Sequence, residues 1–282
     1  MKLFKTSKGI ILQNGSRNYF LKDEWDEIIN RDNLFEYLSQ QINDEQYFDE
    51  PDFAMIMENS IQAPVGKQEV WAAGVTYLRS RDARMEESKD SGGADFYSKV
   101  YNAERPELFF KALAHRVAAH TEKVFIRKDS KWNVPEPELT LFINSNGEIQ
   151  GYTIGNDMSS RDIEGENPLY LPQAKVYERS AALGPCLYVP QQPISTETVI
   201  GITIKRDGKD VFKNEIQLNR MKRTLTELSE YLFRECEFEN GVFLMTGTGI
   251  VPPNDFTLQV DDIVEITIDN IGTLSNTVAY RN

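Results

Sequence analysis

The sequence predicts an α+β protein whose larger part is a β-roll, and three observations lead to this fold class. From Val70 onward the chain shows many short strand-like runs and few segments with helical spacing. It contains no G-x-G-x-x-G motif and no P-loop, so nothing indicates a doubly wound parallel sheet around a nucleotide. Its 282 residues suffice for one large domain, or for a large domain with a small companion.

The first 66 residues are expected to form the companion, a small α/β module, because Pro64-Val65-Gly66 is typical of a boundary. The remainder, residues 67–282, would then form the larger domain. The elements expected in the module are a hairpin of residues 10–12 and 19–21 around Asn14-Gly15, a helix-like stretch over 23–38, and an acidic loop over 44–52.

In the larger domain, turn signals and apolar periodicity define further elements. Asp207-Gly208 lies between two alternating runs and therefore predicts a second hairpin. The other elements expected there are the strands of that hairpin at 199–205 and 210–212, a helix over 224–236, and closing strands at 263–268 and 277–280.

Composition argues against two classes of partner. The 44 acidic and 31 basic side chains give a net charge of −13, which repels the phosphates of nucleic acids and anionic membranes. No apolar run approaches the roughly 20 residues of a membrane-spanning helix, and we see no secretory signal after Met1.

Two cysteines, Cys186 and Cys236, are too few for a disulfide framework or a cysteine-rich zinc site, so we expect a cytoplasmic protein.

A predicted hairpin brings three carboxylates together. The runs 139–143 and 149–154 are strand-like, and Asn146-Gly147 between them is a strong signal for a two-residue turn. In the register that such a turn sets, Glu136 faces Asp157. Glu138 lies two residues from Glu136 and so projects from the same face of its strand.

Like charges that face each other destabilise a sheet unless they are neutralised. A shared proton would neutralise them, and so would a hard divalent cation such as magnesium, manganese or calcium. No histidine or cysteine lies nearby in the sequence, which argues against zinc. The alternative is that the glutamates are solvated at a strand end, or that the register slips by one residue.

Several motifs of the chain resemble those of the fumarylacetoacetate hydrolase superfamily, over about residues 70–282. The motifs that carry the resemblance are E-P-E-L at 136–139, G-Y-T-I-G-N-D-M-S-S-R-D at 151–162, F-F-K at 109–111 and L-M-T-G-T-G at 244–249. The resemblance implies a β-roll domain preceded by a variable N-terminal module. It also implies a magnesium ion held by Glu136, Glu138 and Asp157, the same three residues that the hairpin register selects.

One departure from the superfamily concerns its hydrolytic members, which carry a water-activating histidine three residues after a motif tyrosine. The matching tyrosine here is Tyr77, and Ser80 stands at the histidine position. The two histidines of the chain, His115 and His120, lie elsewhere and are expected to be surface or packing residues. The segments 76–84, 101–107 and 166–175 are instead similar to 2-keto-3-deoxy-pentonate dehydratases of the same superfamily, which act in sugar-acid breakdown.

That resemblance implies loss of water from a 2-keto-3-deoxy-pentonate to give 2,5-dioxopentanoate, in a homodimer or homotetramer. We expect Glu107, which precedes an apolar run, and Lys175, beside a proline-rich loop, to transfer the protons. The alternative is that Glu107 caps a helix and Lys175 only neutralises the carboxylates. Substrate contacts are expected from Arg81, Asp82 and Thr248, although the arginine could pair with glutamates on its own helix and the threonine could belong to a plain turn.

Two other functions remain open at this point. The same metal site could hydrolyse a carbon–carbon bond of an acylpyruvate or decarboxylate oxaloacetate, if another base replaced the histidine. The chain could also be a non-catalytic paralogue that binds keto acids without converting them.

Overall fold

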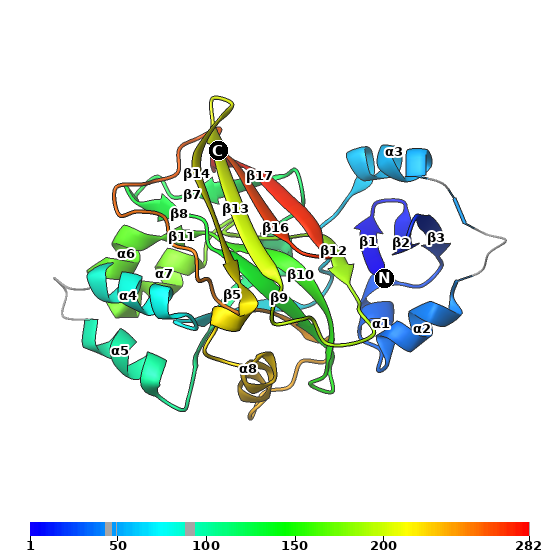
Figure 1. Ribbon diagram of the computed structural model, residues 1–282, viewed down its shortest axis with the longest axis horizontal. Coiled ribbons are helices and arrows are strands. Elements are labelled where there is room, and N and C mark those ends of the chain that lie inside the picture. The colour runs from blue at the N-terminus through cyan, green and yellow to red at the C-terminus, as the bar shows by residue number, and fades with distance from the viewer. Residues whose placement is uncertain (43–46, 49, 88–93, 282) are drawn as a thin grey trace.

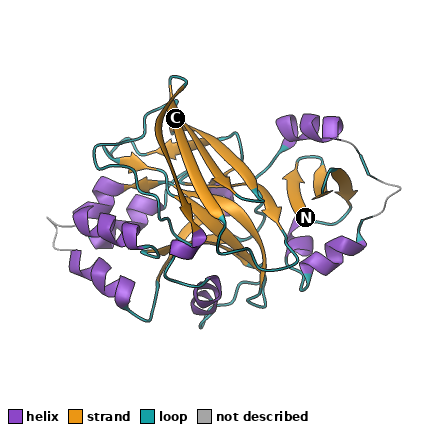
Figure 2. Ribbon diagram, viewed as in Figure 1, coloured by secondary structure: helices purple, strands orange, loops and turns teal. Residues whose placement is uncertain are grey.

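The computed structural model describes residues 1–42, 47–48, 50–87 and 94–281. Twisted strands form the centre of the molecule, as Figure 2 shows. Helices α4 to α7 gather at one end, and the N-terminal strands with α1 to α3 lie at the other (Figure 1). The architecture is a strand-dominated α+β fold, which confirms the predicted class.

The larger sheet runs through the whole molecule and includes strands from both ends of it. Its order is β3-β2-β1-β12-β10-β9-β15-β4-β5, with β6 paired to β12 beside this path. Only the pairs β15–β4 and β12–β6 are parallel among its described pairs. The strands are β1 Lys2–Thr6, β2 Gly9–Asn14, β3 Arg17–Leu21, β4 Glu69–Gly74, β5 Glu107–Leu113, β6 Val117–Ala118, β9 Pro137–Ile143, β10 Ile149–Asp157, β12 Ala181–Tyr188 and β15 Val242–Met245.

A second sheet packs against one face of the first, and the main hydrophobic core lies between them. Its order is β14-β13-β16-β17-β7. Leu141 of β9 and Ile202 of β13 belong to this core, whereas Phe142 points to a second core under the N-terminal strands, α1 and α2. The strands are β7 Lys123–Ile126, β13 Val199–Arg206, β14 Lys209–Gln217, β16 Ile263–Ile268 and β17 Gly272–Tyr280, and a separate pair joins β8 Asn133–Val134 to β11 Ser159–Ser160.

The described helices are short, and none of them is long and apolar enough to cross a bilayer. Helix α8 begins with a capping box, because Thr224 and Glu227 satisfy each other's backbone N–H groups. The helices are α1 Trp25–Ile29, α2 Leu34–Gln40, α3 Glu50–Ser60, α4 Leu78–Glu87, α5 Ala94–Asn102, α6 Arg161–Glu166, α7 Leu171–Lys175 and α8 Leu225–Leu232, with 3₁₀ turns η1 Ala114–Arg116, η2 Pro168–Tyr170 and η3 Leu218–Arg220.

The N-terminal predictions are confirmed in part. The β2–β3 hairpin around Asn14-Gly15 forms as expected. The helix-like stretch is two helices, α1 and α2, because Asn33 adopts a left-handed φ of 51° and breaks the run. The acidic loop predicted over 44–52 is wrong at its end, because helix α3 begins at Glu50. Residues 43–46 and 49 lie outside the described residues.

The boundary at residue 66 stays a prediction, and the sheet continues across the N-terminal module. Strand β1, which the sequence did not reveal, pairs with β2 on one side and with β12 on the other. Further along the chain, the β13–β14 hairpin and the closing strands are confirmed. Helix α8 is confirmed as well, although it ends at Leu232 rather than at residue 236.

Candidate active site

The β9–β10 hairpin has the register that the sequence predicts, but not the predicted turn. Gly155 pairs with Glu138, and the N–H of Asp157 donates a 3.0 Å hydrogen bond to the carbonyl of Glu136. The two-residue turn was wrong, because residues 144–148 form a longer loop closed by a bond from the N–H of residue 144 to the carbonyl of residue 148. A bulge at Gln150 then shifts the pairing by one residue and restores the expected register.

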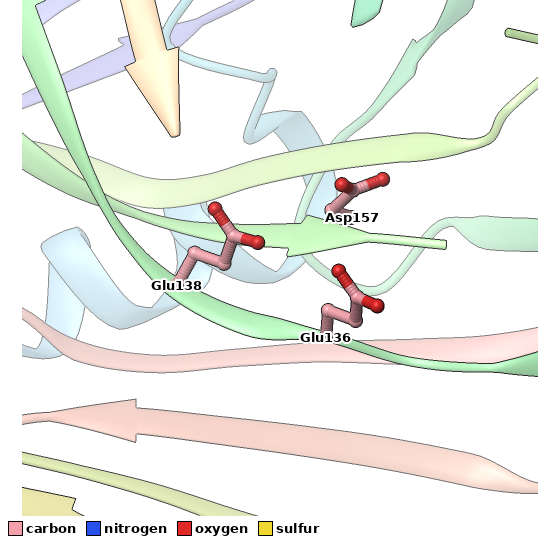
Figure 3. A group of neighbouring side chains, drawn as sticks. All are labelled: Glu136, Glu138 and Asp157. Atoms are coloured by element: carbon pink, nitrogen blue, oxygen red, sulfur yellow. The ribbon is translucent and has the colours of Figure 1, made fainter. Parts of the chain in front are cut away.

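The hairpin brings Glu136, Glu138 and Asp157 together, as Figure 3 shows. Each is buried, and each offers a carboxylate oxygen within 4.8 Å of those of the other two. The group contains no histidine or cysteine among the described residues. Three buried oxygen ligands with three formal negative charges fit a hard divalent cation of the magnesium, manganese or calcium type.

The three carboxyl groups are not electrostatically equivalent. Burial, followed by the charges of Asp157 and Glu136, raises the pKa of Glu138 well above its usual range, although the N–H of Gly247 donates a 2.6 Å bond to it. Burial also acts to raise the pKa of Asp157, but the ammonium groups of Lys111 and Lys175 outweigh it and lower that pKa. Without a cation, Glu138 therefore takes up a proton more readily than Asp157 does.

Lys175 lies at the triad, where the sequence placed it. It ends helix α7, and its Nζ atom is 2.8 Å from Oε2 of Glu136, 3.0 Å from Oδ2 of Asp157 and 2.6 Å from Oγ of Ser159. The side chain is fully buried. A proton carried by Lys175 is thus held within the cluster of carboxylates.

Further buried cations surround the triad, and sequence reasoning gave them no role. Arg161 donates a 3.1 Å bond to Oε1 of Glu136. Arg84, on α4, lies 3.9 Å from the same oxygen and forms an ion pair with Glu164 on α6. Lys111 contacts Asp157, and burial lowers the pKa of Lys111 to about 8. In the sequence these residues look like ordinary surface charges, although Arg161 and Lys111 lie in the motifs already quoted.

Glu107 stands at the start of β5, facing Gly74 of β4. Burial raises the pKa of Glu107, and the charges of Arg84 and Lys175 act in the opposite direction. Its half-buried side chain lines an apolar pocket whose other walls are Phe96, Tyr97, Val100, Asn167, Pro168, Leu169 and Leu171. Two residues along β5, Phe109 lines the triad cavity, with its ring centroid 5.7 Å from Nζ of Lys175.

The predicted substrate contacts differ in where they lie. Thr248 lines the cavity that contains the triad, together with Ser80 and Arg84. Arg81 and Asp82 pair with each other through a 2.6 Å contact on α4. Neither is among the described residues that line the triad cavity. The roles of all the predicted site residues, metal ligands included, stay predictions.

The histidines lie where the sequence analysis expected them. His115 is exposed on η1, and Nδ1 of His120 accepts a bond from the N–H of Ser275. Neither lines the triad cavity in the described part of the chain. Ser80, which stands at the hydrolase histidine position, donates a 2.8 Å bond to the carbonyl of Tyr77.

Comparison with known proteins identifies similar chains. The family model of the fumarylacetoacetate (FAA) hydrolase C-terminal region matches residues 70–279. A probable 2-keto-3-deoxyxylonate dehydratase of Haloferax volcanii is 48% identical over 216 residues, 76% of this chain and 73% of the relative. The 2-dehydro-3-deoxy-D-arabinonate dehydratase of Saccharolobus solfataricus is 45% identical over 224 residues, 78% of this chain and 75% of that enzyme. A solved 2-keto-3-deoxy-D-arabinonate dehydratase complexed with magnesium and 2,5-dioxopentanoate superposes with a TM-score of 0.84 at 35% identity, covering 100% of both chains.

Proposed function

The chain belongs to the fumarylacetoacetate hydrolase family, and we propose that it is a magnesium-dependent dehydratase that converts a 2-keto-3-deoxy-pentonate to 2,5-dioxopentanoate. The observation that carries this function is the buried carboxylate triad, with Lys175 in contact with Glu136 and Asp157 and with serine, not histidine, at position 80. The two named relatives and the solved complex, all dehydratases of such acids, support it. The protein is thus an enzyme, a hydro-lyase of sugar-acid breakdown.

Glu136, Glu138 and Asp157 are the residues that would hold the cation. Their charge and oxygen donors fit magnesium, and manganese or calcium would meet the same donor set. When bound, the cation supplies a Lewis-acid centre for the keto and carboxylate oxygens of the substrate, which makes the protons on carbon 3 more acidic. The triad, Lys175 and Arg161 are all buried, so the ligand oxygens and these two cations are shielded from bulk solvent.

Glu107 is the base in this proposal, and Lys175 is the acid. Glu107 takes a proton from carbon 3, the bond between carbon 4 and its hydroxyl oxygen breaks, and the hydroxyl leaves as water with a proton from Lys175. A proton then moves from carbon 5 to carbon 3, which gives the enol of 2,5-dioxopentanoate, and the enol becomes the aldehyde. The raised pKa of Glu107 favours its role, since a base works best when its pKa approaches the working pH.

Substrate binding is assigned to Thr248, Arg81 and Asp82. Thr248 has direct support from its place in the cavity wall. The support for Arg81 and Asp82 as substrate contacts is their place on α4, the helix that also carries Arg84, which lines the cavity. Assembly into a homodimer or homotetramer and a cytoplasmic location remain part of the proposal, and sedimentation of the purified protein tests the first of these.

The test is formation of aldehyde from 2-keto-3-deoxy-arabinonate and 2-keto-3-deoxy-xylonate, with magnesium and with a chelator. We expect turnover with magnesium and its loss on chelation, reversed by added metal. Release of pyruvate from an acylpyruvate or from oxaloacetate, without dehydration, would replace the proposal with a hydrolase or a decarboxylase. Thermal stabilisation by a keto acid with no turnover of any of these compounds would identify a non-catalytic binding protein.

A further inference from the structure

Lys111 occupies an unusual place in the larger sheet. Strand β5 is the last strand of that sheet as described, and a lysine on such a strand is commonly exposed. Here the side chain is fully buried. The pairing of β4 with β5 also slips at this residue, because Val70 pairs with Ala112 while Trp71 pairs with Phe110. The bulge leaves Lys111 without a partner in the ladder and redirects its side chain into the protein.

The ammonium group of Lys111 contacts three acceptors, which is the number of its N–H groups. Nζ lies 2.5 Å from Oδ1 of Asp157, 2.9 Å from the carbonyl of Met158 and 2.6 Å from the carbonyl of Lys175. The first acceptor belongs to Asp157, the last residue of β10, the second to Met158, which follows it, and the third to the end of α7. Lys111 therefore connects the strand that carries one triad member with the helix that carries the buried lysine.

We propose that Lys111 is a positioning residue that holds Asp157 and Lys175 in the arrangement that metal binding and proton transfer require. This inference rests on the proposed function. Lys111 occupies one carboxylate oxygen of Asp157, while Lys175 contacts the other oxygen. Lys111 itself is not among the described residues that line the triad cavity, so it acts on the substrate only through these two neighbours.

The physical basis is the general role of groups that hydrogen-bond to metal ligands. A carboxylate fixed by an outside donor presents its free lone pairs in one direction, and loss of such a donor typically weakens metal affinity by about 10-fold to 100-fold. The bond to the carbonyl of Lys175 adds a second effect, because it fixes the end of a helix of only five residues. Removal of Lys111 should therefore reduce both magnesium affinity and the rate at saturating magnesium.

The test compares Lys111→Met with wild type by calorimetric titration of magnesium and by steady-state kinetics at saturating metal. We expect the magnesium Kd to rise by roughly 10-fold to 100-fold, with kcat reduced as well. The matched control is Arg206→Met, which also removes a cation from a buried aspartate, since Arg206 lies 2.7 Å from Asp262 and neither residue is among the described residues that line the triad cavity. The control should lose thermal stability while it keeps the Kd and kcat of wild type.

Equal Kd and kcat in Lys111→Met and wild type would overturn the inference, whatever happens to stability. Failure of wild type to bind magnesium would instead reject the proposed function, so the two failures are distinguishable. Should Lys111→Met not fold, Lys111→Gln keeps two N–H donors on a side chain that is one atom shorter and is expected to show a smaller rise in Kd. A crystal structure of the wild-type protein with magnesium needs no variant, and separation of Nζ of Lys111 from Asp157 in it would also refute the inference.

Discussion

The carboxylate of Glu107 occupies the space that a side chain at Gly74 would need. The two residues face each other across the β4–β5 pair, and a Cβ atom built on Gly74 would lie 2.0 Å from Oε2 of Glu107. The φ angle of Gly74 is an ordinary one, so the glycine is required here for space and not for its backbone conformation. The absence of a side chain on β4 thus decides where the proposed base can lie.

Gly74→Ala is expected to displace Glu107 and to reduce kcat by at least about tenfold. The clash involves the end of a flexible side chain, so the fold and magnesium binding should survive. Gly66→Ala is the matched control, because its Cβ would lie 1.9 Å from Oδ1 of Asp26, and neither residue is among the described residues that line the triad cavity. A loss of kcat in the control as large as in Gly74→Ala would show that the effect is one of general stability.

Glu107→Gln is expected to lower kcat by roughly 10²-fold to 10⁴-fold, the usual contribution of a general base. The amide has the same size as the carboxylate but cannot take a proton from carbon 3. Steady-state kinetics and magnesium titration measure the effect, and metal affinity should stay within about twofold of wild type. Glu69→Gln, on the neighbouring strand and bonded to Trp71, is the control with unchanged activity. Full activity of Glu107→Gln would exclude Glu107 as the base.

The pH profile should show an acidic limb that belongs to Glu107. Burial raises the pKa of this carboxyl group, so it binds its proton at a higher pH than an exposed glutamate does. Because the base must be unprotonated, kcat/KM should fall by about tenfold per pH unit below that pKa and reach a plateau above it. Measurement at two saturating magnesium concentrations identifies the group. A limb that moves with magnesium concentration would report metal release and contradict the assignment.

Glu138→Gln and Glu136→Gln are expected to have opposite effects on the stability of the metal-free protein. A carboxyl group whose pKa is raised on folding, as for Glu138, costs stability at neutral pH, so its replacement by an amide should raise Tm. The negative charge of Glu136 instead neutralises the charges of Arg161 and Lys175. Its removal should lower the free energy of unfolding by about 3–5 kcal/mol, because the two buried cations lose this partner.

Calorimetric scanning with and without magnesium tests this pair of variants. Both should lose the stabilisation that magnesium gives to wild type, which amounts to about 2.7 kcal/mol at a metal concentration of 100 times Kd. A drop in the Tm of metal-free Glu138→Gln would contradict the electrostatic argument. Magnesium stabilisation retained in either variant would remove that residue from the ligand set.

The sequence was informative about the site where the chemistry depends on local pairing. Alternation of apolar residues and the position of a turn signal were enough to place Glu136 opposite Asp157. The predicted two-residue turn is nevertheless wrong, because residues 144–148 form a longer loop, and the bulge at Gln150 compensates for its length. A bulge leaves no clear pattern in a single sequence, because it adds one residue without a change in residue type.

Three of the buried charged residues around the triad were not assigned to the site from the sequence. Arg84, Lys111 and Glu164 have the composition of surface residues, and charged side chains are almost always exposed unless they are paired. Their partners are far away in the sequence, as for Lys111 and Asp157, so only the folded chain shows the pairing. Lys175 and Thr248 could be placed at the site from the sequence because they lie in segments that resemble those of related enzymes. The resemblance indicated their position, which the local residue pattern alone does not.

The continuous sheet has a practical consequence for attempts to shorten or exchange the beginning of the chain. Lys2 and Leu3 pair with Tyr188 and Leu187 of β12, the strand whose other end lies beside Asp157. Deletion of the first strands would leave β12 with open hydrogen-bonding groups, a template for association with other chains. A truncated protein should therefore precipitate, and a chimaera with another N-terminal segment should stay dispersed only if that segment supplies a strand in the place of β1.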